Sequence, residues 1–175
     1  MAIKQWMQNL VHEKVSIAPL VTFRVLFGLV IFASIVRFWM NGWIKIQFID
    51  PIFHFKYFGF YWLPEPSAFA AYGLFALMAL SALAIAFGAF YRFSTIAFFL
   101  SFSYVELIDV SYYLNHYYFV SLVSGLMIFL PANRALAIDI KLGLAKPSKQ
   151  VSAIAINLVK FQLAMVYLFA GIAKL

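Results

Sequence analysis

Long apolar runs are the feature that most constrains what this chain can fold into. Residues 67–88, SAFAAYGLFALMALSALAIAFG, contain no charged side chain. A helix of roughly 20 apolar residues is long enough to cross the hydrocarbon core of a bilayer. Over the whole chain of 175 residues, 66% are hydrophobic and only 11% are charged. Because a soluble domain of this length cannot bury so much apolar surface, the sequence predicts an integral membrane protein.

The apolar runs predict an all-α, polytopic membrane helix bundle with about five transmembrane helices. We expect these spans at residues 19–40, 67–88, 94–110, 115–131 and 151–174. Residues 41–66, which are aromatic and interrupted by prolines, are expected to form an interfacial loop between the first two spans. Ala82 and Ala86 have the small-xxx-small spacing that allows close helix contact. Arg24 and Arg37 lie near the two ends of the first span, where long side chains can reach the headgroups.

The distribution of Lys and Arg predicts the orientation of the bundle. These residues occur singly, without the basic patch and interleaved aromatics of a nucleic-acid-binding surface. With five spans, one side of the membrane collects Lys4, Lys14, Arg92, Arg134, Lys141, Lys146 and Lys149, and the other has Arg37, Lys45 and Lys56. The positive-inside rule therefore favours a cytoplasmic N-terminus. The connection at residues 109–116 and the end of the last span then both lie on the outer side.

Several classes of site are not supported by the residues present. The chain has no cysteine, so it has no disulfide, no thiolate nucleophile and no zinc site of the cysteine type. We expect no removable signal peptide, and the chain has none of the phosphate-binding, serine-hydrolase or zinc-protease motifs. We expect no metal site.

Polar side chains interrupt the apolar sequence at residues 104–119, YVELIDVSYYLNHYYF. Glu106, Asp109 and Tyr113 are spaced i, i+3 and i+7, so they share one face if the third helix continues to Tyr113. Ionisable residues at membrane depth are candidates for function. The alternative is structural, with Asp109 and Asn115 capping helix ends.

We expect Glu106 to face the bundle interior and to pair with Arg24 or Lys160. A carboxylate at mid-membrane depth is disfavoured by about 2.5–3.5 kcal/mol unless it finds such a partner.

Two further polar residues allow either a functional or a structural interpretation. His116 suits proton transfer, but a histidine at an interface can also be a polar anchor. Lys174 lies two heptads after Lys160 and shares a helix face with Tyr167 and Gly171. It either reaches the headgroups or turns inward, where apolar surroundings favour the neutral amine and allow it to act as a base.

Five motifs in this order resemble one known family. The chain resembles the transmembrane part of the vitamin K-dependent gamma-carboxylases and their bacterial relatives with the horizontally transferred transmembrane (HTTM) domain. The resemblance covers nearly all of residues 16–175. The motifs are FRVLFG, GAFYRFS, YVELIDVSYYLNHYYF, PANRALAIDI and VYLFAGIAKL.

The resemblance implies a set of site residues. Lys174 matches the base that deprotonates reduced vitamin K, and His116 matches the active-site histidine. Polar support is expected from Asn115, Asp109 and Glu106. The quinone-binding residues are expected to be Tyr113, Tyr117, Tyr167 and Gly171.

The resemblance also implies a lyase reaction with reduced vitamin K (the hydroquinone) as cofactor. Deprotonation and epoxidation of the hydroquinone, with O2, are coupled to carboxylation of a protein or peptide glutamate by CO2. The setting would be a bacterial inner membrane with a periplasmic active side. Residues 1–175 would form the HTTM-like transmembrane domain, and the downstream extramembrane domain of the animal enzymes is absent from this chain.

Two features depart from the animal enzymes and leave enzymatic activity open. The chain lacks their disulfide, and Glu106 stands where they carry an apolar residue. One alternative is a non-catalytic membrane module that binds a quinone or lipid or partners another subunit. The other is a small transporter with Glu106 and Lys160 as a proton relay.

Overall fold

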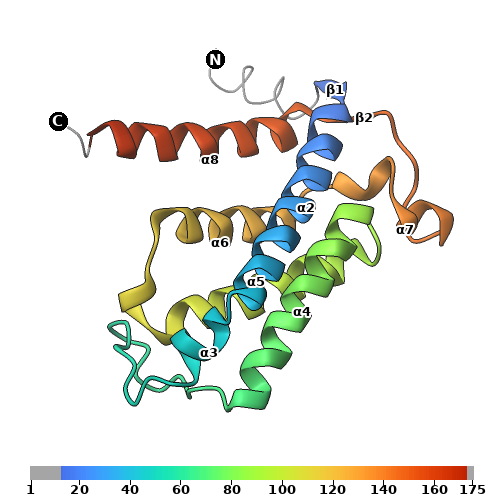
Figure 1. Cartoon of the computed structure of the whole chain (residues 1–175). Coiled ribbons are helices and arrows are strands. Elements are labelled where there is room, and N and C mark those ends of the chain that lie inside the picture. The colour runs from blue at the N-terminus through green and yellow to red at the C-terminus, as the bar shows by residue number, and fades with distance from the viewer. Residues whose placement is uncertain (1–12, 173–175) are drawn as a thin grey trace.

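The protein is a helical bundle in which five long helices carry most of the chain (Figure 1). The computed structural model describes residues 13–172. The long helices are α2 (Ala18–Met40), α4 (Ala68–Phe87), α5 (Tyr91–Ile108), α6 (Asn115–Met127) and α8 (Ala153–Ile172). The expected all-α membrane bundle is confirmed, because α2, α4 and α8 are long and apolar enough to cross a bilayer.

α5 and α6 meet that criterion less well than the other three long helices. α5 includes Arg92, Glu106 and several serines. α6 has 13 residues and is therefore about 20 Å long, shorter than the roughly 30 Å of a hydrocarbon core. The count of about five spans is thus an approximation.

Short elements gather at one end of the bundle. β1 (Lys14–Ser16) pairs antiparallel with β2 (Gln150–Ser152), so α2 and α8 begin side by side. η2 (Ala132–Arg134) and α7 (Ile138–Lys141) follow α6. The backbone N–H of Asp139 donates to the carbonyl of Gly88 at 2.9 Å, which fastens α7 to the turn between α4 and α5.

The opposite end is built from α3 (Trp43–Phe48), the loop at residues 49–67 and η1 (Val110–Tyr112). The Val110 N–H donates to the carbonyl of Phe55 at 2.8 Å. The Tyr104 hydroxyl donates to the carbonyl of Pro64 at 2.7 Å. The loop is therefore attached to α5 and η1 at two separate points, and many of its aromatic side chains remain exposed.

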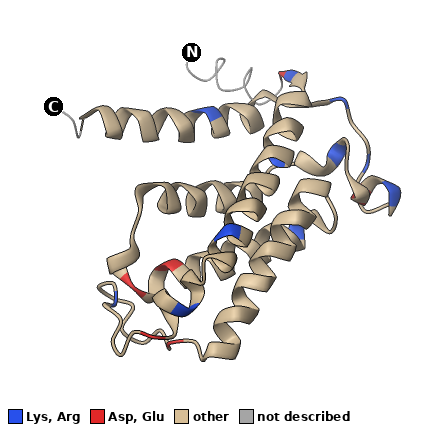
Figure 2. Cartoon of the chain, viewed as in Figure 1, with Lys and Arg blue, Asp and Glu red and all other residues tan. Residues whose placement is uncertain are grey.

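The balance of charge differs between these two ends, although both carry side chains of each sign (Figure 2). The basic end carries Lys14, Arg92, Arg134, Lys141, Lys146 and Lys149 together with Glu13 and Asp139. The acidic end carries Asp50, Glu65, Glu106 and Asp109 together with Lys45 and Lys56.

α2 and α4 approach each other closely at small residues. A Cβ added to Gly28 would lie 2.6 Å from the carbonyl oxygen of Ala82 and 2.6 Å from the backbone nitrogen of Ala86. The close contact expected at Ala82 and Ala86 is confirmed, and a glycine of α2 makes it possible.

Arg24 is completely buried, so the expectation that it reaches the headgroups is wrong. Its guanidinium donates to four backbone carbonyls, those of Ala132 (2.8 Å), Ala135 (3.2 Å), Leu136 (2.6 Å) and Ala86 (3.3 Å). The planar fork of arginine suits this task because it presents several donors in fixed directions. Arg24 thereby joins α2 and α4 to the segment that follows α6.

α8 packs mainly at its beginning. Ala153 and Ala155 are buried, whereas most later side chains of the helix are exposed. In Figure 1, α8 begins beside the strands and extends away from α4.

Candidate functional site

A pocket of about 260 Å³ opens among α2, α3, α4, α5 and α6 near the acidic end. Most of its wall is apolar or aromatic. These side chains are Val30, Ile31, Ile35, Phe38, Trp43, Phe48, Phe75, Met78, Phe102, Val105, Tyr112, Tyr117 and Val120. The polar lining residues are Ser34, Arg37, Gln47, Glu106, Asp109 and His116. An apolar pocket with a few convergent polar groups is the usual form of a small-molecule site.

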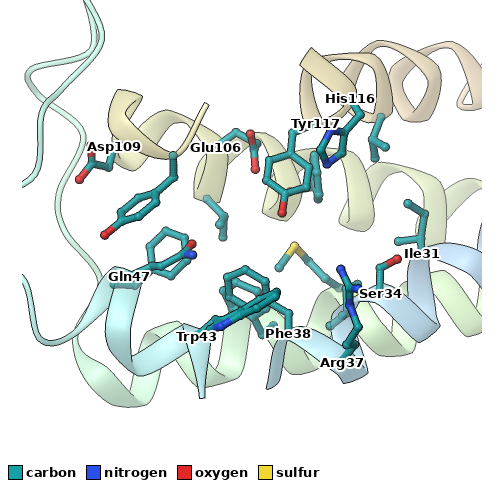
Figure 3. A pocket seen from close by; sticks show the side chains of 18 of the residues that line it. Ile31, Ser34, Arg37, Phe38, Trp43, Gln47, Glu106, Asp109, His116 and Tyr117 are labelled. Carbon is teal, nitrogen blue, oxygen red and sulfur yellow. The ribbon is translucent and has the colours of Figure 1, made fainter. Parts of the chain in front are cut away.

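The polar groups approach the pocket from different walls (Figure 3). Glu106, His116 and Tyr117 come from α5 and α6, and Arg37 and Trp43 come from α2 and α3 on the other side. The pocket therefore offers an acceptor on one wall and a cation on the opposite wall.

Asp109 is held by two hydrogen bonds just beyond the end of α5. Its Oδ2 lies 3.0 Å from Nδ1 of His54, and its Oδ1 accepts from the backbone N–H of Ser111 at 2.8 Å. Because an ionised carboxylate can only accept, Nδ1 of His54 carries the proton. The side chains of His54 and Asp109 are both buried.

The environment of Asp109 favours its charged form. Burial by itself raises the pKa of the carboxyl group, but the hydrogen bonds from Ser111 and His54 and the charge of His54 outweigh it. The pKa of Asp109 is therefore held below its ordinary value. Both carboxylate oxygens of Asp109 accept hydrogen bonds, and these bonds hold the turn between α5 and η1 in place. Figure 3 shows the carboxylate directed away from the pocket centre.

The expected ion pair of Glu106 with Arg24 or Lys160 is not formed. The guanidinium of Arg24 donates its hydrogen bonds to backbone carbonyls. Lys160 is exposed on α8. Within residues 13–172, the Glu106 side chain makes no hydrogen bond or ion pair. It is half-buried and points into the pocket (Figure 3), so its charge faces a cavity instead of a cation.

The expected shared face of Glu106, Asp109 and Tyr113 is also corrected. α5 ends at Ile108, and Asp109 has an extended backbone with φ −144° and ψ 118°. The side chain of Asp109 caps η1, so the helix stops before Tyr113. Tyr113 is exposed and does not line the pocket.

Asp109 therefore caps a helix as the structural interpretation expected, but Asn115 does not. Leu114 occupies the position before α6, and no side chain caps that helix. Asn115 lies in the first turn of α6 with an exposed side chain.

The pocket brings together some of the expected site residues and not others. His116 and Tyr117 line it, with their rings 4.5 Å apart and edge-on. Tyr167 and Gly171 are exposed on α8 and do not line it. Lys174 lies outside the described residues.

Sequence reasoning did not assign His54, Trp43 or Gln47 to the site. All three lie in the segment expected to form an interfacial loop. Aromatic and polar side chains are common at a membrane interface, so they do not by themselves indicate a site. Arg37 was interpreted only as an end-of-span anchor. No local spacing signals the 3.0 Å contact of His54 with Asp109, because 55 residues separate the two in the chain.

Within residues 13–172, no group of three or more His, Asp or Glu side chains is arranged to hold a metal ion.

The comparison with known families settles what kind of domain this is. The model of the HTTM domain matches residues 12–175, which is nearly the entire chain. The chain belongs to the HTTM domain family. The HTTM domain is a membrane domain of the gamma-carboxylase family, so the resemblance based on the five motifs is confirmed at the level of the family. No solved structure matches the chain.

Proposed function

We propose that this HTTM domain is the quinone-handling membrane module of a vitamin K-dependent gamma-carboxylase-like enzyme. The observation that carries the proposal is the pocket near the acidic end. It joins an aromatic lining to a free carboxylate and to His116, within a domain of the gamma-carboxylase family. Its volume of about 260 Å³ is close to the lower end of the range for small-molecule sites, about 300–1,000 Å³.

The lining residues fit a lipophilic ring with polar oxygens. Phe38, Trp43 and Tyr117 offer aromatic surface, and Glu106 and Arg37 offer hydrogen-bonding partners on opposite walls. When bound, reduced vitamin K supplies, with O2, the strong base that removes a γ-proton from a glutamate before CO2 adds. The residues of this chain would hold the ring, exclude water and move the first proton.

In this proposal Lys174 accepts a proton from a ligand hydroxyl at its Nζ. Apolar surroundings disfavour the ammonium form of a lysine, so a neutral amine is available near neutral pH. His116 assists by hydrogen bonding, and Asp109 and Asn115 support the segment that carries it. Tyr113, Tyr167 and Gly171 would reach the ligand only if the end of α8 closes toward α6.

The charge of the two ends supports the proposed orientation. The basic end would face the cytoplasm and the acidic end the periplasm of a bacterial inner membrane. A glutamate-containing protein or peptide would then reach the pocket from the outer side.

The test is hydroquinone epoxidation by the full-length protein in membranes supplied with reduced vitamin K. Lys174→Ala should reduce epoxidation at least a hundredfold, because the base is lost, and a small exogenous amine should partly restore it. His116→Ala should be impaired in a way that an amine does not rescue. Lys160→Ala, on the same helix, is the matched control and should leave epoxidation unchanged.

Normal epoxidation by the Lys174→Ala protein would show that this lysine is a headgroup anchor. The catalytic assignment would then fail at its most important residue.

A second candidate is a non-catalytic module that binds a quinone and partners another subunit. The exposure of most of α8 favours it, since an apolar helix with so little buried surface is available to another membrane helix. Quinone binding without epoxidation in the full-length protein would support this candidate over the first.

A further inference from the structure

The Glu106 side chain is unusual because it is half-buried, unpaired within residues 13–172 and directed into an apolar pocket. A charged group without a partner in such a setting carries a desolvation cost. The fold does not relieve that cost with Arg24 or with Lys160. A ligand group that donates a hydrogen bond would relieve it.

Arg37 lies across the pocket from Glu106 (Figure 3). Its guanidinium is 5.7 Å from the ring centroid of Trp43, a distance at which cation–π attraction operates. It makes no ion pair with another described residue. Tyr117 lines the pocket on the same wall as Glu106.

We propose that Glu106 makes this pocket selective for the reduced form of its ring ligand, and that Arg37 orients the ring. Glu106 accepts a hydrogen bond from one ligand hydroxyl, and Arg37 donates to an oxygen on the other side of the ring. This inference rests on the proposed function, because it assumes that the pocket binds a quinone or hydroquinone.

The selectivity follows from the hydrogen-bonding capacity of each group. An ionised carboxylate only accepts, and the carbonyl oxygens of a quinone also only accept. The oxidised ring therefore leaves Glu106 opposite another acceptor, whereas a hydroquinone hydroxyl donates to it. Arginine only donates, so it serves oxygens of both forms and does not distinguish them. Discrimination is strong when a mismatched ligand leaves a buried polar group unpaired.

The test measures binding of menadione and of its reduced form, menadiol, to the protein in lipid nanodiscs without oxygen. Trp43 lines the pocket, and its fluorescence reports binding. The Trp43→Phe variant shows how much of the fluorescence change comes from Trp43. Binding is measured from pH 6 to pH 9, because the preference requires the ionised carboxylate of Glu106, whereas a protonated carboxyl group also donates.

In the wild-type protein, menadiol should bind about tenfold more tightly than menadione. Glu106→Gln should remove that preference, because an amide both donates and accepts. Arg37→Gln should weaken both forms by a similar factor and leave the preference in place. Glu65→Gln and Lys45→Gln are the matched controls, since these residues lie near the acidic end but do not line the pocket.

The outcomes separate this inference from the proposed function. If neither form changes the Trp43 signal in the wild-type protein, quinone binding in this pocket is wrong. If both forms bind equally to the wild-type protein, the selectivity is wrong while quinone binding stands. If Glu106→Gln keeps the tenfold preference, Glu106 is not its source. Glu106→Leu, checked for folding by circular dichroism, should bind menadiol no better than menadione and provides a second test.

Discussion

His54 and Asp109 show how one residue pair can attach a loop to the wall of a pocket. His54 belongs to the loop at residues 49–67, and Asp109 follows α5 at the edge of the pocket. A hydrogen bond between buried groups contributes little net stability, but leaving one partner unsatisfied costs about 1–3 kcal/mol. The neighbouring bond from Val110 to Phe55 holds the same two segments through their backbones.

At the residue scale, we expect His54→Leu to lower the free energy of unfolding by about 1–3 kcal/mol, because Oδ2 of Asp109 loses its donor. Thermal unfolding in detergent, followed by circular dichroism, measures the change. His116→Leu is the matched control, since that histidine is exposed and forms no hydrogen bond within the described residues. Equal melting temperatures for the two variants would contradict a stabilising His54–Asp109 contact.

The same contact predicts an acid-dependent loss of stability. The pKa of Asp109 is lower in the folded protein than its ordinary value, which is about 3.9. Its stabilisation is therefore complete above about pH 4 and disappears as the pH falls through the lower, folded pKa. Asp109→Asn should melt below the wild-type protein at pH 7, and the difference should shrink as the pH is lowered below about 4. A difference that stays constant down to pH 2 would contradict the assignment.

At the scale of elements, the crossing of α2 and α4 depends on the absence of a side chain at Gly28. The neighbouring atoms on α4 belong partly to its backbone, which cannot move aside as a flexible side chain can. The contact also positions the pocket, because α2 contributes Arg37 and α4 contributes Phe75 and Met78 to its lining.

We expect Gly28→Ala to destabilise the protein by about 1–3 kcal/mol, the usual cost of overpacking a tight interface. Gly73→Ala is the matched control on α4, since a Cβ there meets nothing within 4 Å. Thermal melting in one detergent compares the two variants. A Gly28→Ala protein as stable as the Gly73→Ala protein would mean that the two helices separate at little cost.

At the scale of the whole molecule, the connections give the long helices an alternating direction. Pairing of β1 with β2 places the beginnings of α2 and α8 at the basic end. Contacts of residues 49–67 with the end of α5 and with η1 place that loop at the acidic end. The positive-inside rule then predicts that the basic end faces the cytoplasm.

We expect a reporter inserted at Gly143 to be cytoplasmic and one inserted at Gly59 to be outside. Both glycines have a positive φ and open space around them, so an insertion there should disturb little packing. Alkaline phosphatase, which is active only outside the cytoplasm, should be active at Gly59 and inactive at Gly143. The reverse pattern would invert the orientation, and activity at both sites would contradict the bundle topology.

The sequence alone determined the class of the protein, since long apolar runs require lipid and the order of five motifs indicated the family. It also located the close approach of α4 to another helix, because small residues at a spacing of four carry that signal locally. The polar segment at residues 104–119 was also recognisable locally, because its two acids, its amide and its imidazole are each costly in an apolar setting.

The partners of those polar residues were decided only by the tertiary structure. Arg24 meets carbonyls that lie 62 to 112 residues away in the chain, and His54 meets Asp109 across 55 residues. The helix that carries Glu106 ends at Ile108, because the backbone of Asp109 is extended. The side chain of Asp109 then caps the following 3-10 turn. Periodicity describes one helix at a time. It cannot show which distant donor satisfies a buried acceptor, and for that reason only the folded chain shows that Glu106 faces a pocket without a partner among the described residues.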